Sequence, residues 1–217
     1  MCAVARARKG GCFHAMLNHR TLYNPANEHD ACGVGLFCRI DGTPSHAVVA
    51  KGLLTLLDLD HRGACGCDEE TGDGAGILIQ LPHRFFEAHV KGLPDPGDYG
   101  AGMVFLPPAH AERAKALLVE IAQTEGVRLF AWRRVPTRSD LIGTAARLTE
   151  PTIWQCFLRC AQDMDRSTLD QKLYVVRKVF HQEANRRGMH GCYVASLSTR
   201  TLVYLSLIHI SEPTRPY

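Results

Sequence analysis

The sequence predicts a protein of the α+β class, either a single domain or part of a larger protein. Apolar residues recur every second residue in several short runs, as in strands, and every three or four residues in longer stretches, as in helices. These stretches come in groups along the 217 residues and do not alternate strictly. Such grouping favours an α+β arrangement, and 46% hydrophobic residues suffice for a core.

The N-terminal part begins with an irregular segment. Residues 1–31 have no apolar period, and the turn residues at 24–27 add to this interpretation, so we expect a leader without regular structure. An apolar run predicts a buried strand over 33–40, which Asp41-Gly42 ends as a turn. A helix should follow over 45–60. Its apolar stripe is Val49, Leu53, Leu56 and Leu57.

Two further helices and several strands follow a glycine-rich loop at 63–76. The first of these helices should end at Gly126 and the longer one at Arg186-Arg187-Gly188, after opening with capping-box spacing at 167–170. Their inward residues are Ala114, Leu117, Leu118, Ile121 and Ala122 in the first, and Leu169, Leu173, Val176 and Phe180 in the second. The expected strands are 77–81, 103–106, 127–135, 153–160 and a hairpin-like pair, 193–197 and 201–205.

Composition excludes several classes of function. A net charge of +3, from 25 basic and 22 acidic residues, is too balanced to indicate binding to nucleic acid or to a membrane surface. Nine cysteines at irregular spacings form no disulfide framework, so we expect a reduced, cytosolic protein. No apolar run is long enough for a secretory signal or a membrane span.

The stretch from Glu28 to Gly35, Glu-His-Asp-Ala-Cys-Gly-Val-Gly, carries the candidate chemistry. Gly33 and Gly35 leave bare backbone beside Cys32, so its thiol should be easy to reach at the start of the expected strand. The alternative is a cysteine that packs as a small hydrophobic residue, as most free cysteines do.

Three motifs in this order resemble the start of the glutamate synthase large-subunit family: Glu28 to Gly35, His61-Arg62-Gly63, and Thr71-Gly72-Asp73-Gly74-Ala75-Gly76. The resemblance runs from about Leu22 to Tyr204. It implies a four-layer αββα sandwich of the Ntn-hydrolase type, with two packed antiparallel sheets. It also implies that the leader is removed and that Cys32 becomes the N-terminal nucleophile of a glutamine-hydrolysing domain.

An N-terminal cysteine carries a nucleophile, its thiol, and a base, its α-amine. The α-amine has a reference pKa of ~7.7–8.0 and the thiol ~8.5, so the amine can take the thiol proton near neutral pH. By resemblance, Arg62 lies near the glutamine pocket, where its fork of donors can orient a carboxylate or a loop carbonyl. A solvated arginine at a helix end is the alternative. His61 is the weaker candidate. The Thr71–Gly76 loop lacks the pattern of a phosphate-binding loop and is expected to wall the pocket.

The resemblance also divides the chain into a leader (1–31), a partial class II amidotransferase domain (32–205) and a tail (206–217) that resembles translated read-through of foreign sequence. The family's Arg-Phe-Ser-Thr and His-Asn-Gly-Glu segments, the latter with the oxyanion hole, do not occur in these residues. The chain alone is therefore expected to be inactive. FMN, an iron-sulfur cluster, the remaining synthase domains and a small electron-donating subunit would belong to the parent protein.

Two other interpretations stay open. Cys38 with Cys65 and Cys67 could form a metal or redox module, although a lone C-x-C is weak zinc evidence. A stand-alone class II amidotransferase domain would also carry these motifs. Cys156 and Cys160 have helical spacing but lie in a strand pattern, where both would share one face, so we interpret them as core residues.

Overall fold

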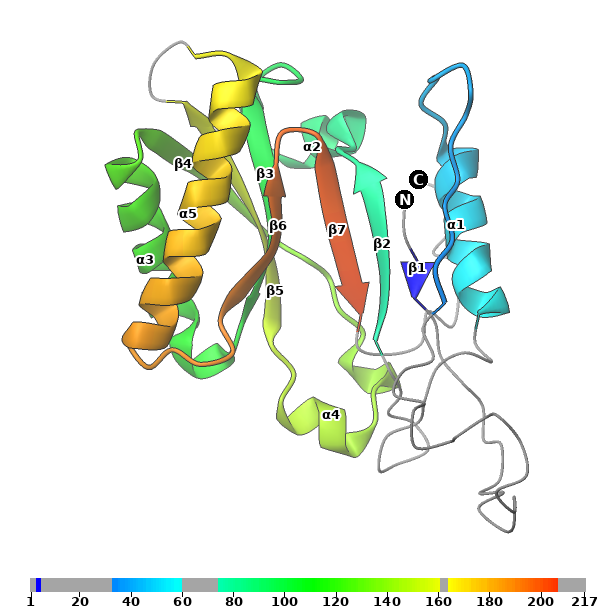
Figure 1. Ribbon diagram of the computed structural model, residues 1–217. Helices are drawn as coiled ribbons and strands as arrows, with labels where there is room; N and C mark the ends of the chain where they lie inside the picture. The colour runs from blue at the N-terminus through cyan, green and yellow to red at the C-terminus, as the bar shows by residue number, and fades with distance from the viewer. Residues whose placement is uncertain (1–2, 5–32, 60–73, 161–163, 207–217) are drawn as a thin grey trace, which may run out of the picture. The chain divides into compact units, whose positions relative to one another are not determined.

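The computed structural model describes residues 3–4, 33–59, 74–160 and 164–206 (Figure 1). The described residues fall into two compact units, with the boundary between Ile77 and Leu78 and a return to the first unit at Ser206. The larger unit, residues 78–205, contains most of the regular structure.

A four-stranded antiparallel sheet forms the centre of the larger unit. Its strand order is β4-β5-β3-β6. The strands are β3 (Tyr99–Leu106), β4 (Val127–Arg134), β5 (Thr152–Cys160) and β6 (Tyr193–Ser198). All eight residues of β3 are buried, since it lies between β5 and β6. β3 begins four residues before the predicted strand 103–106, so Gly100 and Gly102 belong to its ladder.

Two helices, α3 (Ala111–Thr124) and α5 (Arg166–Arg186), cover one face of this sheet. Every residue of the two predicted inward stripes is buried, which confirms both helix predictions. Gly126 has φ +72° after α3 and Gly188 has φ +70° after α5, so the predicted C-terminal glycines are also confirmed. The N-cap of α5 is Asp165, before the predicted capping box, and it accepts hydrogen bonds from the N–H groups of Ser167 and Thr168.

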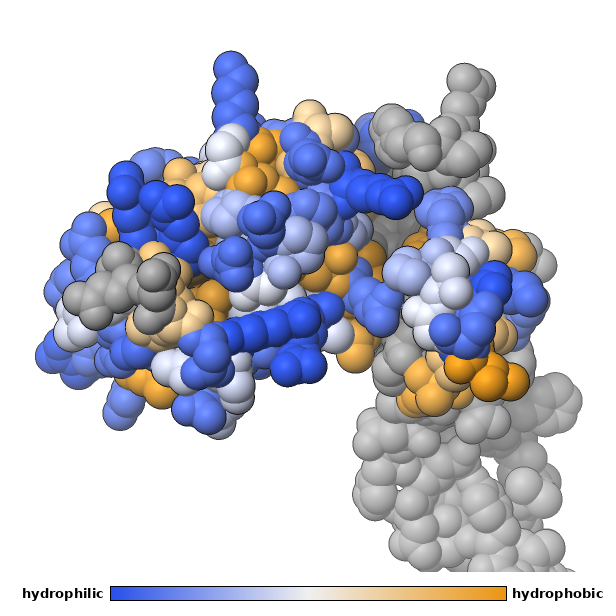
Figure 2. Space-filling model, turned by 90° about the horizontal axis from the view of Figure 1, so that it is seen from above, coloured by the Kyte–Doolittle hydropathy of each residue, from blue (hydrophilic) through white to orange (hydrophobic). Residues whose placement is uncertain are grey.

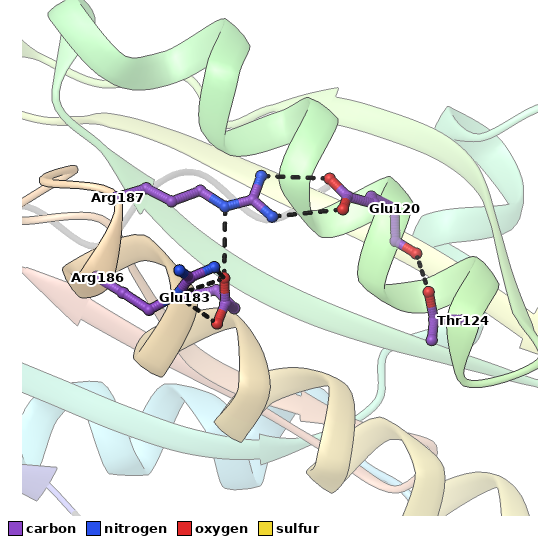
Figure 3. Close-up of polar contacts among 5 residues, drawn as sticks. All are labelled: Glu120, Thr124, Glu183, Arg186 and Arg187. Atoms are coloured by element: carbon purple, nitrogen blue, oxygen red, sulfur yellow. Dashed lines mark hydrogen bonds and ion pairs between the residues drawn. The ribbon is translucent and has the colours of Figure 1, made fainter.

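Charged side chains join the outer surfaces of these two helices (Figure 3). The Arg187 guanidinium lies 3.3 Å from Glu120 of α3 and 3.4 Å from Glu183 of α5, and Arg186 pairs with Glu183 at 2.6 Å. Because these groups are solvated, such pairs contribute little to stability. The larger contribution comes from the apolar layer beneath them.

The other face of the sheet has a second apolar cluster. It is formed with α2 (His83–His89) and with strand β7 (Thr201–Ser206). Phe86 and Phe157 meet edge to face at 4.9 Å between ring centres. The buried members are Phe86, Val90, Tyr99, Ala101, Met103, Phe105, Phe157 and Leu202.

A second sheet has the order β1-β2-β7, where β1 is Ala3–Val4 and β2 is Ala75–Gln80. A tight turn joins β6 and β7 (Figure 1). The two strands belong to different sheets and form no common hairpin, contrary to the predicted hairpin-like pair. Asp170 of α5 fixes the turn: its carboxylate accepts from Thr199 N–H at 2.7 Å and from Arg200 Nε at 3.3 Å. The α+β class with two sheets is therefore confirmed.

In the smaller unit, the predicted helix 45–60 is present as α1 (His46–Asp58), and Ser45 is its N-cap residue. Leu56 is buried in the expected stripe, whereas Leu57 is 45% exposed and lies outside it. Residues 33–39 form no strand, contrary to the prediction, and no described strand pairs with them. The expected burial is also wrong, because the side chains of Val34, Leu36 and Ile40 are exposed.

Short helical segments complete the described structure: η3 (Pro108–His110), η4 (Ser139–Leu141) and α4 (Thr144–Leu148). Figure 2 shows a face on which hydrophilic side chains predominate and apolar ones occur in small groups. Within the described ranges, no helix has both the length and the apolar character needed to cross a bilayer.

Candidate active site

The predicted site residues themselves, Cys32, His61 and Arg62, lie outside the described residues. Cys65, Cys67 and positions 71–73 of the expected pocket loop lie outside them as well. The described chain resumes on either side of these positions, at Gly33, at Leu59 and at Gly74. The described structure therefore contains the residues that flank the predicted site residues in the sequence.

Gly33, the residue after Cys32, is buried against the end of α1. A Cβ atom at this position would lie 2.7 Å from Leu59 Cδ2 and 3.1 Å from its Cγ, so any larger residue would displace Leu59. Leu59 is the C-cap residue of α1 and directly precedes the segment that contains His61-Arg62-Gly63. The segment after the candidate nucleophile thus packs on the helix that leads to the candidate arginine.

Gly35, two residues after Gly33, also lies close to α1. A Cβ atom there would lie 3.0 Å from Thr55 Cγ2, one helical turn before Leu59. Glycine at alternate positions therefore allows the extended segment to follow α1 closely. The close approach to α1 is a structural reason for the two glycines of the first sequence motif.

The glycine-rich loop predicted over 63–76 ends earlier than expected. β2 begins at Ala75, inside the Thr71–Gly76 motif, and Gly76 pairs with Val4 of β1. A motif that runs into a strand differs from a phosphate-binding loop, where a helix would follow.

Among the described thiols, three are unsuited to nucleophilic catalysis. Burial raises the pKa of Cys156 to about 12, and burial also raises the pKa values of Cys160 and Cys192. These thiols stay protonated at neutral pH, and only the thiolate is a strong nucleophile. Cys156 is buried and Cys160 packs against the same apolar cluster, which confirms the core interpretation of this pair. Cys38 is exposed.

The sequence interpretation missed one polar group in the larger unit. Arg133 of β4, Gln155 of β5 and Tyr204 of β7 are joined by hydrogen bonds through the buried Gln155 amide. The available signal was the glutamine itself, in the apolar run Ile-Trp-Gln-Cys-Phe-Leu that otherwise reads as a buried strand. A buried polar side chain needs partners, and here they come from two other strands.

Two antiparallel sheets with a helical layer define an α+β domain. The sequence pattern of the class-II glutamine amidotransferases matches residues 32–215. The chain belongs to this family.

Several glutamate synthases are similar to this chain in sequence. The NADPH glutamate synthase large chain of Bacillus subtilis is 39% identical over 90% of this chain and 13% of its own length. The NADPH glutamate synthase large chain of Azospirillum brasilense is 36% identical over 94% of this chain and 14% of its own length. Ferredoxin-dependent glutamate synthase 2 of Synechocystis is 35% identical over 83% of this chain and 12% of its own length. The match thus covers about one eighth of the length of these relatives.

Proposed function

We propose that these residues form the glutamine-hydrolysing part of a glutamate synthase large subunit, with Cys32 as its nucleophile. The observation that carries the proposal is the coincidence at Cys32: the family match begins there, and the next residue is a glycine that packs too tightly on Leu59 for a side chain. We also propose the division into a leader (1–31), an amidotransferase segment (32–205) and a foreign tail (206–217).

The proposed reaction begins after cleavage between Ala31 and Cys32. The free α-amine takes the thiol proton, and the thiolate attacks the carboxamide carbon of glutamine. The C–N bond then breaks as the nitrogen accepts the proton, which releases ammonia and leaves a thioester. Water hydrolyses the thioester to glutamate and restores the thiol. An amide nitrogen, as in the uncleaved chain, is not basic enough for the first step.

Arg62 is proposed to hold the substrate or a loop of the pocket. Three residues of chain span at most ~11 Å, so Arg62 cannot lie far from Leu59. Leu59 in turn meets Gly33, the neighbour of Cys32. This short covalent path supports a common site, and the fixed fork of a guanidinium suits a carboxylate.

For the parent protein we propose synthesis of glutamate from glutamine and 2-oxoglutarate. FMN, an iron-sulfur cluster and the electron-donor site would lie in domains beyond these residues. The names of relatives give NADPH, ferredoxin and NADH as donors, which leaves the donor of this protein open. A small electron-donating subunit and a cytosolic location belong to the same proposal.

The test compares ammonia release from glutamine by proteins that begin at Cys32. They are this chain, a version extended through the two missing family segments, and the extended version with Cys32→Ser or Cys38→Ser. The extended protein and its Cys38→Ser control should turn over. Cys32→Ser should remove activity, and this chain should be close to inert, because each lost oxyanion donor costs ~10²–10³ in rate.

Activity of the extended Cys32→Ser protein equal to that of its parent would refute the assignment of the nucleophile. Turnover by the short chain would show that the oxyanion hole lies elsewhere. N-terminal sequencing tests the leader, since an active protein that retains residues 1–31 would exclude the amine as base. Stoichiometric zinc or iron in the purified protein would favour the metal module at Cys38, Cys65 and Cys67 instead.

A further inference from the structure

Arg133 is a partly buried cation without an acidic partner in the described structure. It lies on β4, an edge strand, and its guanidinium carbon is 5.0 Å from the centre of the Phe85 ring. Its Nη1 donates to Gln155 Oε1 at 2.9 Å. The guanidinium lies over the face of this ring, and a contact of this kind uses none of its N–H hydrogen-bond donors.

Gln155 fixes the geometry around this arginine. It is fully buried on β5. Because arginine can only donate, the amide oxygen of Gln155 must face Arg133 and its nitrogen must face the other way. That nitrogen donates to the Tyr204 hydroxyl at 2.8 Å, and its second contact is Met103 Sδ at 3.5 Å. The amide therefore holds Arg133 and Tyr204 at its two ends.

The cluster of Arg133, Gln155 and Tyr204 has more donors than acceptors. A guanidinium has five N–H donors, of which one has an acceptor among the described residues. The Tyr204 oxygen accepts from Gln155, so the hydroxyl hydrogen remains available, and no described acceptor takes it. The group is complementary to an acceptor that carries negative charge and two oxygens.

The surrounding charge has the same sign. Between Val127 and Glu150 there are five arginines, against Asp140 and Glu150. Asp140 pairs with Arg138, and Glu150 accepts a hydrogen bond from Ser139. The positive charge of Arg133 is therefore not balanced by the acidic groups of its own strand and of the loop that follows.

We propose that Arg133 and Tyr204, held by Gln155, bind a carboxylate. Arg133 would present two N–H groups to the carboxylate in bidentate geometry, and Tyr204 would donate its hydroxyl hydrogen. The carboxylate comes either from a free amino acid or from an acidic side chain of the parent polypeptide beyond these residues. The site uses none of the residues assigned to glutamine hydrolysis and stands independently of that proposal.

The test measures carboxylate binding to the 217-residue chain. The melting temperature is followed with increasing sodium L-glutamate, with sodium chloride keeping the ionic strength constant. Glutamate should stabilise the chain, and Arg133→Gln should weaken its apparent affinity at least tenfold. Arg134→Gln is the matched control, because it removes the same charge from the next, exposed residue of β4, and it should retain binding.

Two further variants guard against misfolding of Arg133→Gln. Arg133→Lys keeps the positive charge but lacks the paired N–H groups of a guanidinium, so it should bind glutamate more weakly than the unsubstituted chain. Tyr204→Phe should also bind glutamate more weakly, while its ring stays in the core. Stabilisation by glutamate in the short chain but not in an extended protein would assign the carboxylate to the parent polypeptide. Stabilisation in both would assign it to a free ligand. The proposal would be overturned if glutamate raised the melting temperatures of the unsubstituted chain, Arg133→Lys and Tyr204→Phe equally. It would also be overturned if glutamate did not change the melting temperature of the unsubstituted chain.

Discussion

Replacing Gly102 by alanine should destabilise the protein, although alanine is normally the better residue inside a strand. Gly102 lies in the middle of β3, between β5 and β6. A Cβ atom there would be 2.7 Å from the Ser196 carbonyl oxygen, 2.9 Å from Leu197 Cδ1 and 3.0 Å from Cys156 Sγ. All three neighbours are buried residues, so the added methyl group has no open space to occupy.

The size of the effect follows from two opposing contributions. Burying one more methyl group stabilises by ~0.8 kcal/mol, whereas overpacking a core costs about 1–3 kcal/mol. The nearest atom is a backbone oxygen of the paired strand β6, which cannot rotate away as a side chain can. We therefore expect the upper end of that cost and a net loss of about 2 kcal/mol. For a chain of 217 residues this corresponds to a melting temperature lower by roughly 4–8 °C.

Gly100 provides a matched comparison two residues earlier on β3. A Cβ atom there would lie 2.2 Å from Leu173 Cδ1, the end of a side chain, and 3.4 Å from the nearest backbone atom. Leu173→Val removes that Cδ atom, so it should relieve Gly100→Ala in a double-mutant cycle. Leu197→Val should relieve Gly102→Ala little, because the Ser196 oxygen remains.

Urea unfolding followed by circular dichroism measures all these variants. An unchanged midpoint for Gly102→Ala would refute the packing argument. Full rescue of Gly102→Ala by Leu197→Val would show that the side chain, and not the backbone oxygen, limits the space.

Two further predictions concern His181 and Asp170. Burial lowers the pKa of His181, whose Nε2 accepts from Val194 N–H at 2.8 Å, so the folded state binds fewer protons here than the unfolded state. The stability that depends on neutral His181 is complete above about pH 6.5 and is lost as the pH falls through the folded-state pKa. The urea midpoints at pH 7.5 and pH 5.5 should therefore differ less in His181→Gln than in the unsubstituted chain. An equal difference in both proteins would contradict this. Asp170→Ala leaves the N–H of Thr199, a residue 1% exposed, without its acceptor and should lower the free energy of unfolding by about 1–3 kcal/mol. Asp170→Asn keeps an acceptor oxygen and should cost less. Equal urea midpoints of the two variants would count against this interpretation.

The structure corrects the sequence interpretation mainly where distant segments meet. Gly100 and Gly102 weaken a strand pattern locally, so the predicted strand began at residue 103. In the folded protein these glycines allow Leu173 of α5 and the backbone of β6 to approach β3. The apolar run at 33–40 favours a buried strand, yet a strand also needs a partner to exchange hydrogen bonds with, and the described residues offer none.

The sequence by itself determined the local features, because period, caps and glycine stops act within a few residues. These include the inward stripes of α3 and α5, the glycine ends at Gly126 and Gly188, and the ordered motifs around Cys32 that indicate the family. Only the tertiary structure decided that β6 and β7 part into separate sheets. It alone brings together Arg133 and Tyr204, 71 positions apart in the sequence (204 − 133), at one buried glutamine. Such contacts depend on strand pairing and sheet packing, and no short stretch of sequence specifies either one.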